Sequence, residues 1–371
     1  MKTKALLFTL ISLLGGIVAN AQPCPLPDLL KQPGNWIAAK PNPVYRVAPA
    51  DLAKQRTIVN TIIQPVQKNY APKGVDIEFN SAHLDESRLP KYIQSGNYYT
   101  ADFTFAKHDC PYNRALIDKK LSGAYDIDVI RLHINDLAFR FAQTFFVPEQ
   151  PNQENPWTDG FALIDARPVK EGAAWNWKGV GRTGTDEQFW LIAKDDLLPF
   201  SYVSKKEFSE RLKVYYQKKI KEAESNYVNN VKSAEEAYEN VKKFNAAEAT
   251  KYKEQSAVQY RKQLEIEKNQ YTKNITIVDN ILKNDKTLNE PAIIDHIKSY
   301  FHFDGFVEAS HIYARYAIKP NPAYFDPKLP KSSPQFMVLY YNTSTEPIFK
   351  AAREEFFKAL DFASLKAMLG K

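Results

Sequence analysis

The chain has 371 residues, a net charge of +7 from 50 Lys and Arg against 43 Asp and Glu, and two cysteines. This length suffices for about two domains with a hydrophobic core. Its cations are scattered among acidic residues, whereas binding to nucleic acid requires clustered cations, so we expect no nucleic-acid partner. Beyond the first residues no apolar stretch is long enough to cross a bilayer, so we expect no membrane span.

The N-terminal residues predict export. Lys2 and Lys4 precede an apolar run, Ala5–Val18, and residues 19–21 (Ala-Asn-Ala) place small side chains where a signal peptidase recognises them. The run is too short to span a bilayer. We therefore expect a signal peptide at 1–21 that is cleaved after Ala21, and an exported protein in the periplasm or outside the cell.

Cys24 and Cys110 both belong to the exported part of the chain. In an oxidising compartment such a pair usually forms a disulfide, so we expect these two residues to be linked. The alternative is two free thiols with a redox role, but no Cys-x-x-Cys motif supports it.

Residues 22–203 predict an α+β domain with a mainly antiparallel sheet. A helical pattern over 51–63 is expected to end or kink at Pro65. Apolar and polar residues then alternate, which is typical of half-buried strands. The predicted strands are 99–105, 128–134, 161–165, 174–180 and 189–193.

Residues 204–284 predict a helical arm. No proline lies between Pro199 and Pro291, and Ser204 with Glu207 forms a capping box. Tyrosines recur at eleven-residue spacing, which returns to nearly the same side of a helix and so predicts a packing seam. These seam residues, which we expect to contact a partner, are Tyr216, Tyr227, Tyr238, Tyr260 and Tyr271.

The arm is predicted to be a coiled-coil-like helical hairpin that turns near 244–250; a single long rod is the alternative. Residues 285–371 offer only two convincing strands, 311–318 and 335–341, and a helix near 346–360. Those elements are too few for an independent core. A hairpin would return this segment to complete the sheet domain.

No catalytic signature stands out. The six histidines show no metal-ligand spacing, and P-loop, Gly-x-Ser-x-Gly and Gly-x-Gly-x-x-Gly motifs are lacking, so we expect no catalytic residue, metal or cofactor. Trp175 and Trp177 lie two apart on a predicted strand and so face the same side. They form either part of the core or a stacking platform for a ligand such as a sugar or peptide.

Two segments, LLPFSYVSKKEF (197–208) and NPAYFDPKLPKSSPQF (321–336), flank the predicted arm. They resemble a group of uncharacterised secreted bacterial proteins in which similar segments flank a helical insertion. The resemblance implies export and this architecture, and it carries no activity.

The pattern favours an exported, non-enzymatic binding or scaffold protein of the bacterial envelope that contacts a protein partner, or a second copy, through its helical arm. The alternative is a secreted hydrolase acting on envelope glycan or peptide, with the two tryptophans near its cleft. An exposed apolar stripe on the arm would favour the first, and a deep polar pocket the second.

Overall fold

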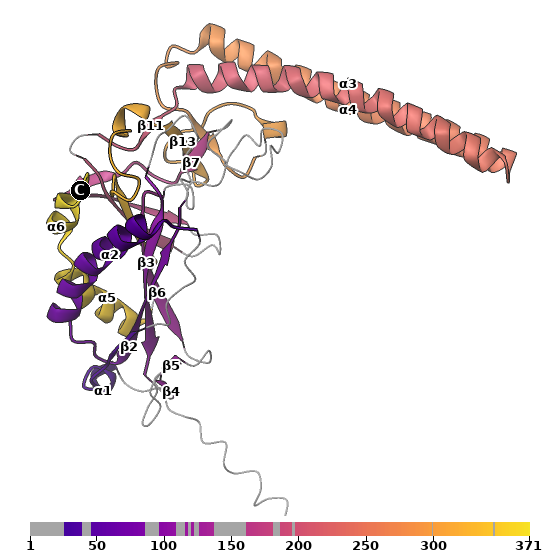
Figure 1. Cartoon of the computed structure of the whole chain (residues 1–371). Coiled ribbons are helices and arrows are strands. Elements are labelled where there is room, and N and C mark those ends of the chain that lie inside the picture. The colour runs from indigo at the N-terminus through magenta and orange to yellow at the C-terminus, as the bar shows by residue number, and fades with distance from the viewer. Residues whose placement is uncertain are drawn as a thin grey trace, which may run out of the picture.

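The structure is a computed structural model that describes residues 26–38, 46–85, 96–108, 116–117, 120–121, 126–136, 161–180, 186–194, 197–298, 300–343 and 346–371. As predicted, the fold is α+β: a mostly antiparallel sheet carries a long helical hairpin (Figure 1). Cys24, Cys110 and residues 1–21 lie outside the described residues, so the disulfide and the signal peptide stay predictions.

The main sheet has eight strands in the order β1-β2-β3-β6-β14-β10-β9-β8. All neighbours pair antiparallel except β1 with β2. In that order the strands are Trp36–Ala38, Val75–His83, Tyr99–Lys107, Ile127–Ile134, Met337–Asn342, Asp186–Ile192, Ala174–Val180 and Val169–Glu171. The strand that follows the arm, β14, therefore lies in the middle of the sheet between two strands that precede it. A separate pair is formed by β4 (Leu116–Ile117) and β5 (Lys120–Leu121).

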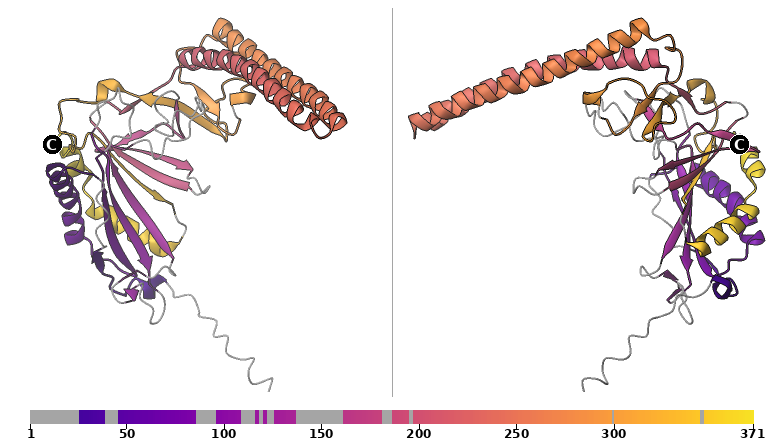
Figure 2. Two further views of the ribbon diagram at one scale, coloured as in Figure 1. Left: turned by 45° about the vertical axis from the view of Figure 1, so that its right-hand side comes forward. Right: turned by 180° about the vertical axis from the view of Figure 1, so that it is seen from behind.

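Helices cover one face of this sheet (Figure 2). They are α1 (Leu26–Leu29), α2 (Pro49–Asn69), α5 (Pro347–Ala359) and α6 (Phe362–Ala367). In β3 and β6 the alternate residues that face these helices are buried, as the period of two in the sequence requires. Phe356 of α5 is central, because its ring lies 4.8 Å from that of Phe103 and 5.6 Å from that of Phe105.

The first long helix does not end at Pro65, as one of the two expected outcomes had it: α2 continues to Asn69 with Pro65 inside it. Proline removes one backbone hydrogen bond, but packing outweighs that loss. Val66 is 1% exposed in the main core, and the carbonyl of Tyr70, just after the helix, accepts a hydrogen bond from Trp36 Nε1 at 3.0 Å.

A second sheet separates the main sheet from the arm. It contains β11 (Phe200–Tyr202), β13 (Ala314–Pro320), β12 (Ile293–Asp295) and β7 (Ala162–Ile164), with β13 pairing to all three others. Alternate residues serve two cores. Ile318 packs in the cluster shared with the main sheet, whereas Ala317 packs in the cluster at the base of the arm. Two short 3-10 helices, η1 (Tyr300–His302) and η2 (Pro322–Tyr324), flank β13.

The arm is a hairpin of two helices, α3 (Lys205–Lys242) and α4 (Ala246–Asn284), so the single-rod alternative is excluded. At 1.5 Å per residue each helix extends about 57 Å, and the pair projects from the body (Figures 1 and 2). Asn245 makes the turn possible by capping α4: its side chain accepts from Glu248 N at 3.1 Å and donates to Glu248 Oε2 at 3.1 Å. This capping box begins α4 close to the predicted turn.

Candidate functional site

The base of the arm belongs to the core of the body. Tyr216 and Tyr271, two of the seam tyrosines, are 0% and 7% exposed and their ring centroids lie 5.9 Å apart. Phe301 of η1 stands edge-on to Tyr271 at 5.3 Å. Burial raises the pKa of the Tyr216 hydroxyl, and the neighbouring Tyr271 adds to the effect although a hydrogen bond with Asn274 opposes it. These two tyrosines are therefore placed where they join the arm to the body.

The start of α3 is fixed in the same region. The Ser204 hydroxyl accepts from Glu207 N at 3.1 Å, which is the predicted cap. The carboxylate of Glu207 also contacts Lys319 of β13 at 2.6 Å. The arm thus leaves the second sheet at a defined point rather than through a free linker.

Beyond the base, the seam between the helices changes character. Tyr227, Tyr238 and Tyr260 are only half-buried. In this distal part the buried residues are small: Ala223, Ala234, Ala249 and Ser256. The ring of Tyr238 is flanked by ammonium groups, with Lys253 Nζ at 4.7 Å and Lys242 Nζ at 5.2 Å from its centroid. The distal arm is accordingly held by close helix contact with little apolar core.

The end of the arm exposes a large apolar side chain. Phe244 lies in the turn between the helices and is 91% exposed, and Val241 one turn earlier is 37% exposed. Sequence analysis did not single out Phe244, although its position in the predicted turn region was the available signal. Other exposed aliphatic residues occur along the arm: Val214 and Val228 lie fourteen residues apart on nearly the same side of α3, and Val258 lies on α4.

The two candidate stacking residues differ in placement. Trp177 is 4% exposed and stacks on Phe189 with centroids 5.0 Å apart and planes at 6°. Phe189 in turn lies 5.9 Å from Tyr340. Trp175 is half-buried at the margin of the same cluster, with Lys170 Nζ 5.7 Å from its ring centroid. Trp177 is therefore a core residue, and Trp175 keeps a partly exposed ring.

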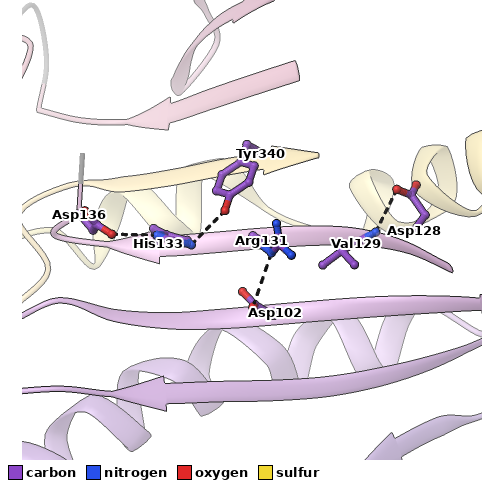
Figure 3. A network of polar contacts seen from close by, with 7 residues as sticks. All are labelled: Asp102, Asp128, Val129, Arg131, His133, Asp136 and Tyr340. Atoms are coloured by element: carbon purple, nitrogen blue, oxygen red, sulfur yellow. Dashed lines mark hydrogen bonds and ion pairs between the residues drawn. The ribbon is translucent and has the colours of Figure 1, made fainter. Parts of the chain in front are cut away.

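Beyond this aromatic cluster, Asp136, His133 and Tyr340 form a line of polar contacts at β6 and β14, which we call the polar row (Figure 3). His133 of β6 contacts Asp136 Oδ2 through Nδ1 at 3.1 Å, and its Nε2 lies 3.3 Å from the Tyr340 hydroxyl. A carboxylate, an imidazole and a phenol in line can orient the ring and move a proton. All three residues are buried, at 7%, 2% and 2% exposure for His133, Asp136 and Tyr340. The His-x-x-Asp spacing was the signal that sequence analysis missed.

Beside this row, Arg131 Nε lies 3.8 Å from Asp102 Oδ2 on the neighbouring strand β3 (Figure 3). Burial raises the pKa of the Asp102 carboxyl, and the charges of His133 and Arg131 oppose this shift only in part. The side chain as a whole is 35% exposed, so only its inner oxygen is shielded from solvent. The pair can stabilise the pairing of two strands.

One of the two segments that carry the resemblance is built into the body. Ser332 and Ser333 are fully buried in the proline-rich loop before β14. The Ser332 hydroxyl donates to Asp51 Oδ1 at 2.8 Å, and Lys54 Nζ donates to the Ser333 hydroxyl at 2.8 Å. Tyr99 also donates from its hydroxyl to the Ser332 carbonyl at 3.0 Å. The segment therefore connects α2 to the end of the main sheet.

Comparison with protein-family models, curated proteins and solved structures gave no match. Across the described ranges, no helix is long and apolar enough to cross a membrane. Within the same ranges, no group of three or more His, Cys, Asp or Glu residues has the geometry of a metal site.

A hollow of about 490 Å³ lies between the end of α2 and α5, lined in part by Tyr70, Lys73 and Glu355.

Proposed function

We propose that this chain is an exported, non-enzymatic binding or scaffold protein of the bacterial envelope that contacts a protein partner through the helical arm. One observation carries the proposal. Two helices of about 57 Å project from a folded body, yet their distal part buries only small side chains and ends in a phenylalanine that is 91% exposed. A long projection with little core of its own contributes little to the stability of the body, which favours a role in contact.

Site-specific photocrosslinking in the native envelope tests this function. A photoreactive phenylalanine analogue at Phe244, and separately at Val241, is expected to yield a covalent adduct with an exported protein that mass spectrometry identifies. The matched control is the same analogue at Ile312, which is 79% exposed on the body. The identified protein must then bind the purified full chain and lose that binding when the distal arm is excised. Equal adducts from Ile312 and the arm, or none from the arm, would contradict the proposal.

A secreted hydrolase acting on envelope glycan or peptide is the second candidate, and the Asp136–His133–Tyr340 row favours it. Such an enzyme would retain its turnover after excision of the distal arm and lose it on His133→Ala. Release of soluble fragments from purified peptidoglycan and from envelope peptides measures this. Turnover that is absent from the intact chain, or unchanged by His133→Ala, rules out this site.

A further inference from the structure

The two sides of the arm differ in charge. On one side three ion pairs cross from α3 to α4: Lys213 with Asp279 at 2.6 Å, Glu224 with Lys268 at 2.5 Å, and Glu235 with Lys253 at 2.6 Å. The three α3 residues are eleven apart, so helical geometry places them on one side of that helix. We call this the ion-pair side.

The opposite side carries mainly uncharged polar side chains in its middle, with charges at its base end, where Gln263 donates to Glu267 at 2.6 Å and Lys219 pairs with Glu222. We call it the amide face. On each helix its residues follow one another at spacings of three or four, which keeps them on one side. They are Asn230, Ser233 and Ala237 on α3, and Gln255, Gln259 and Gln263 on α4. All but the half-buried Ala237 are exposed. The face ends at Phe244 on the tip, and Ile266, which is 49% exposed, lies toward the base.

The base end of this face is already covered by protein. Gln270 Nε2 and Asn274 Nδ2 both donate to the carbonyl oxygen of Phe301 in η1, at 3.0 and 2.9 Å. The Phe301 ring packs against Tyr271 in the same place. The amide face is thus the continuation of an interface that the chain itself uses. From Gln270 to the start of α4 it extends about 36 Å.

We infer that the occupant of the amide face is the same face of a second copy of this chain, so that two arms pack side by side in an antiparallel pair. This rests on the proposed role of the arm as the contact element. Amide groups both donate and accept hydrogen bonds, so a surface of Asn and Gln is complementary to itself. A partner of opposite charge would be expected to select a charged face, whereas a face with few charges lets two identical copies meet with little like-charge repulsion.

The dimensions fit such a pair. A face about 36 Å long and about 20 Å wide, the width of two helices, buries about 700 Å² on each copy. That gives roughly 1,400 Å² in total, within the range of stable protein interfaces. Antiparallel packing would also place the exposed Phe244 of each copy over the base end of the other copy's amide face.

The ion pairs between α3 and α4 show which residues of the two helices lie opposite each other, and so they locate the centre of the proposed two-copy contact. Since Glu235 lies opposite Lys253 and Glu224 opposite Lys268, Asn230 lies opposite Gln259, close to the middle of the face. In a two-fold pair these central residues of one copy meet those of the other. Asn230→Lys with Gln259→Lys therefore brings four like charges together. The control, Val228→Lys with Ala257→Lys, adds the same charge at nearly the same level on the ion-pair side.

Sedimentation equilibrium of the full chain under reducing conditions is the test, with circular dichroism to verify that each variant folds. We expect a dimer whose dissociation constant rises at least about 100-fold in the Asn230/Gln259 lysine variant and changes less than about threefold in the control. An equimolar mixture of that lysine variant with Asn230→Glu/Gln259→Glu should restore the dimer.

A monomer at all concentrations overturns the inference, as does equal weakening by both lysine variants or a mixture that fails to associate. The proposed function is distinguished by the crosslinking experiment. If the chain is monomeric but Phe244 yields an adduct with a different exported protein, the contact role stands and self-association fails. If neither a dimer nor an arm-specific adduct forms, both fail.

Discussion

At the scale of single residues, Asn135 fastens together two segments that are distant in the sequence. Its backbone has a φ of +58°, which asparagine tolerates better than most residues. Its side chain donates to the Asn97 carbonyl at 3.1 Å and the Ser333 carbonyl at 2.9 Å, and accepts from Gln335 N at 2.7 Å. The residue is fully buried, so all three bonds are shielded from water.

Asn135→Ala should lower the free energy of unfolding by roughly 3 kcal/mol or more, because it leaves three buried groups without their partner. Asn135→Gly separates this effect from backbone strain, since glycine suits a positive φ. We expect both variants to be destabilised to a similar extent in urea titrations, with the exposed Asn342→Ala as control. Recovery of wild-type stability in the glycine variant would show that the backbone conformation matters more than the hydrogen bonds.

Asp76 makes the fold sensitive to acid. It is fully buried, and its carboxylate lies 2.7 Å from Asn35 N and 3.2 Å from His108 Nε2. Burial by itself raises the pKa of Asp76, but the contacts with His108 and Asn35 outweigh burial and hold the pKa below its usual value of 3.8. A depressed pKa in the folded state stabilises the protein above pH 3.8, and this contribution is lost as pH falls below it.

We therefore expect the unfolding free energy of the wild type to fall more steeply below about pH 4 than that of Asp76→Asn, which has no proton to gain there. Urea titrations at a series of pH values measure the two slopes. The exposed Asp28→Asn, treated in the same way, should keep the wild-type slope. Parallel curves for wild type and Asp76→Asn would refute the role of this carboxylate.

Neither of these residue networks could be predicted from the sequence. Asp76 and His108 meet only because β2 pairs with β3, and Asn135 meets Gln335 only because β14 lies beside β6. Hydrophobic alternation indicates that a strand exists and which side is buried, but not which strand will be its neighbour. The His133–Asp136 contact is the exception, because its partners lie within one short stretch of sequence.

At the scale of elements, the eleven-residue tyrosine repeat correctly predicted that a helix packs along this side and forms a seam. It did not distinguish tyrosines that join the arm to the body from those that hold the arm together. Tyr216 and Tyr271 are buried because the second sheet and η1 cover them, and that cover comes from residues outside the arm. The spacing alone contains no information about this cover.

Changing Tyr227 and Tyr238 together to serine should loosen the distal arm and leave the sheet domain folded. Each ring is half-buried in the seam, so the pair is expected to remove about 2 kcal/mol of local stability. Hydrogen exchange should accelerate between residues 223 and 267 and remain slow in β3, β6 and β14. Val214→Ser with Val228→Ser, on exposed positions away from the seam, is the matched control.

If the tyrosine double variant instead unfolds the whole chain in one cooperative transition, the arm is not a separately opening element. If hydrogen exchange accelerates equally in the valine control, the two seam rings contribute no specific stability to the arm.

At the scale of the whole molecule, three cores lie in sequence from the helices to the arm. The first lies between the helices and the main sheet, the second between the two sheets, and the third between the second sheet and the base of the arm. The chain passes through all of them before and after the arm. The fold class could be predicted because the spacing of apolar residues changes along the chain from that of strands to that of helices. The order of the three cores could not be predicted, because it depends on the pairing of β13 and β14 with strands that are distant in the sequence.

This layering predicts where the arm can be cut. Replacing residues 223–266 by a short glycine-containing turn keeps Tyr216 and Tyr271 in the third core, so we expect the melting temperature of the body to change by no more than a few degrees. A deeper excision of residues 213–277 removes both rings, and with them the contact between Tyr271 and Phe301, and exposes the fully buried Phe208. That variant should melt markedly lower or aggregate. Differential scanning calorimetry compares the two, and equal melting temperatures would show that the third core contributes nothing to the stability of the body.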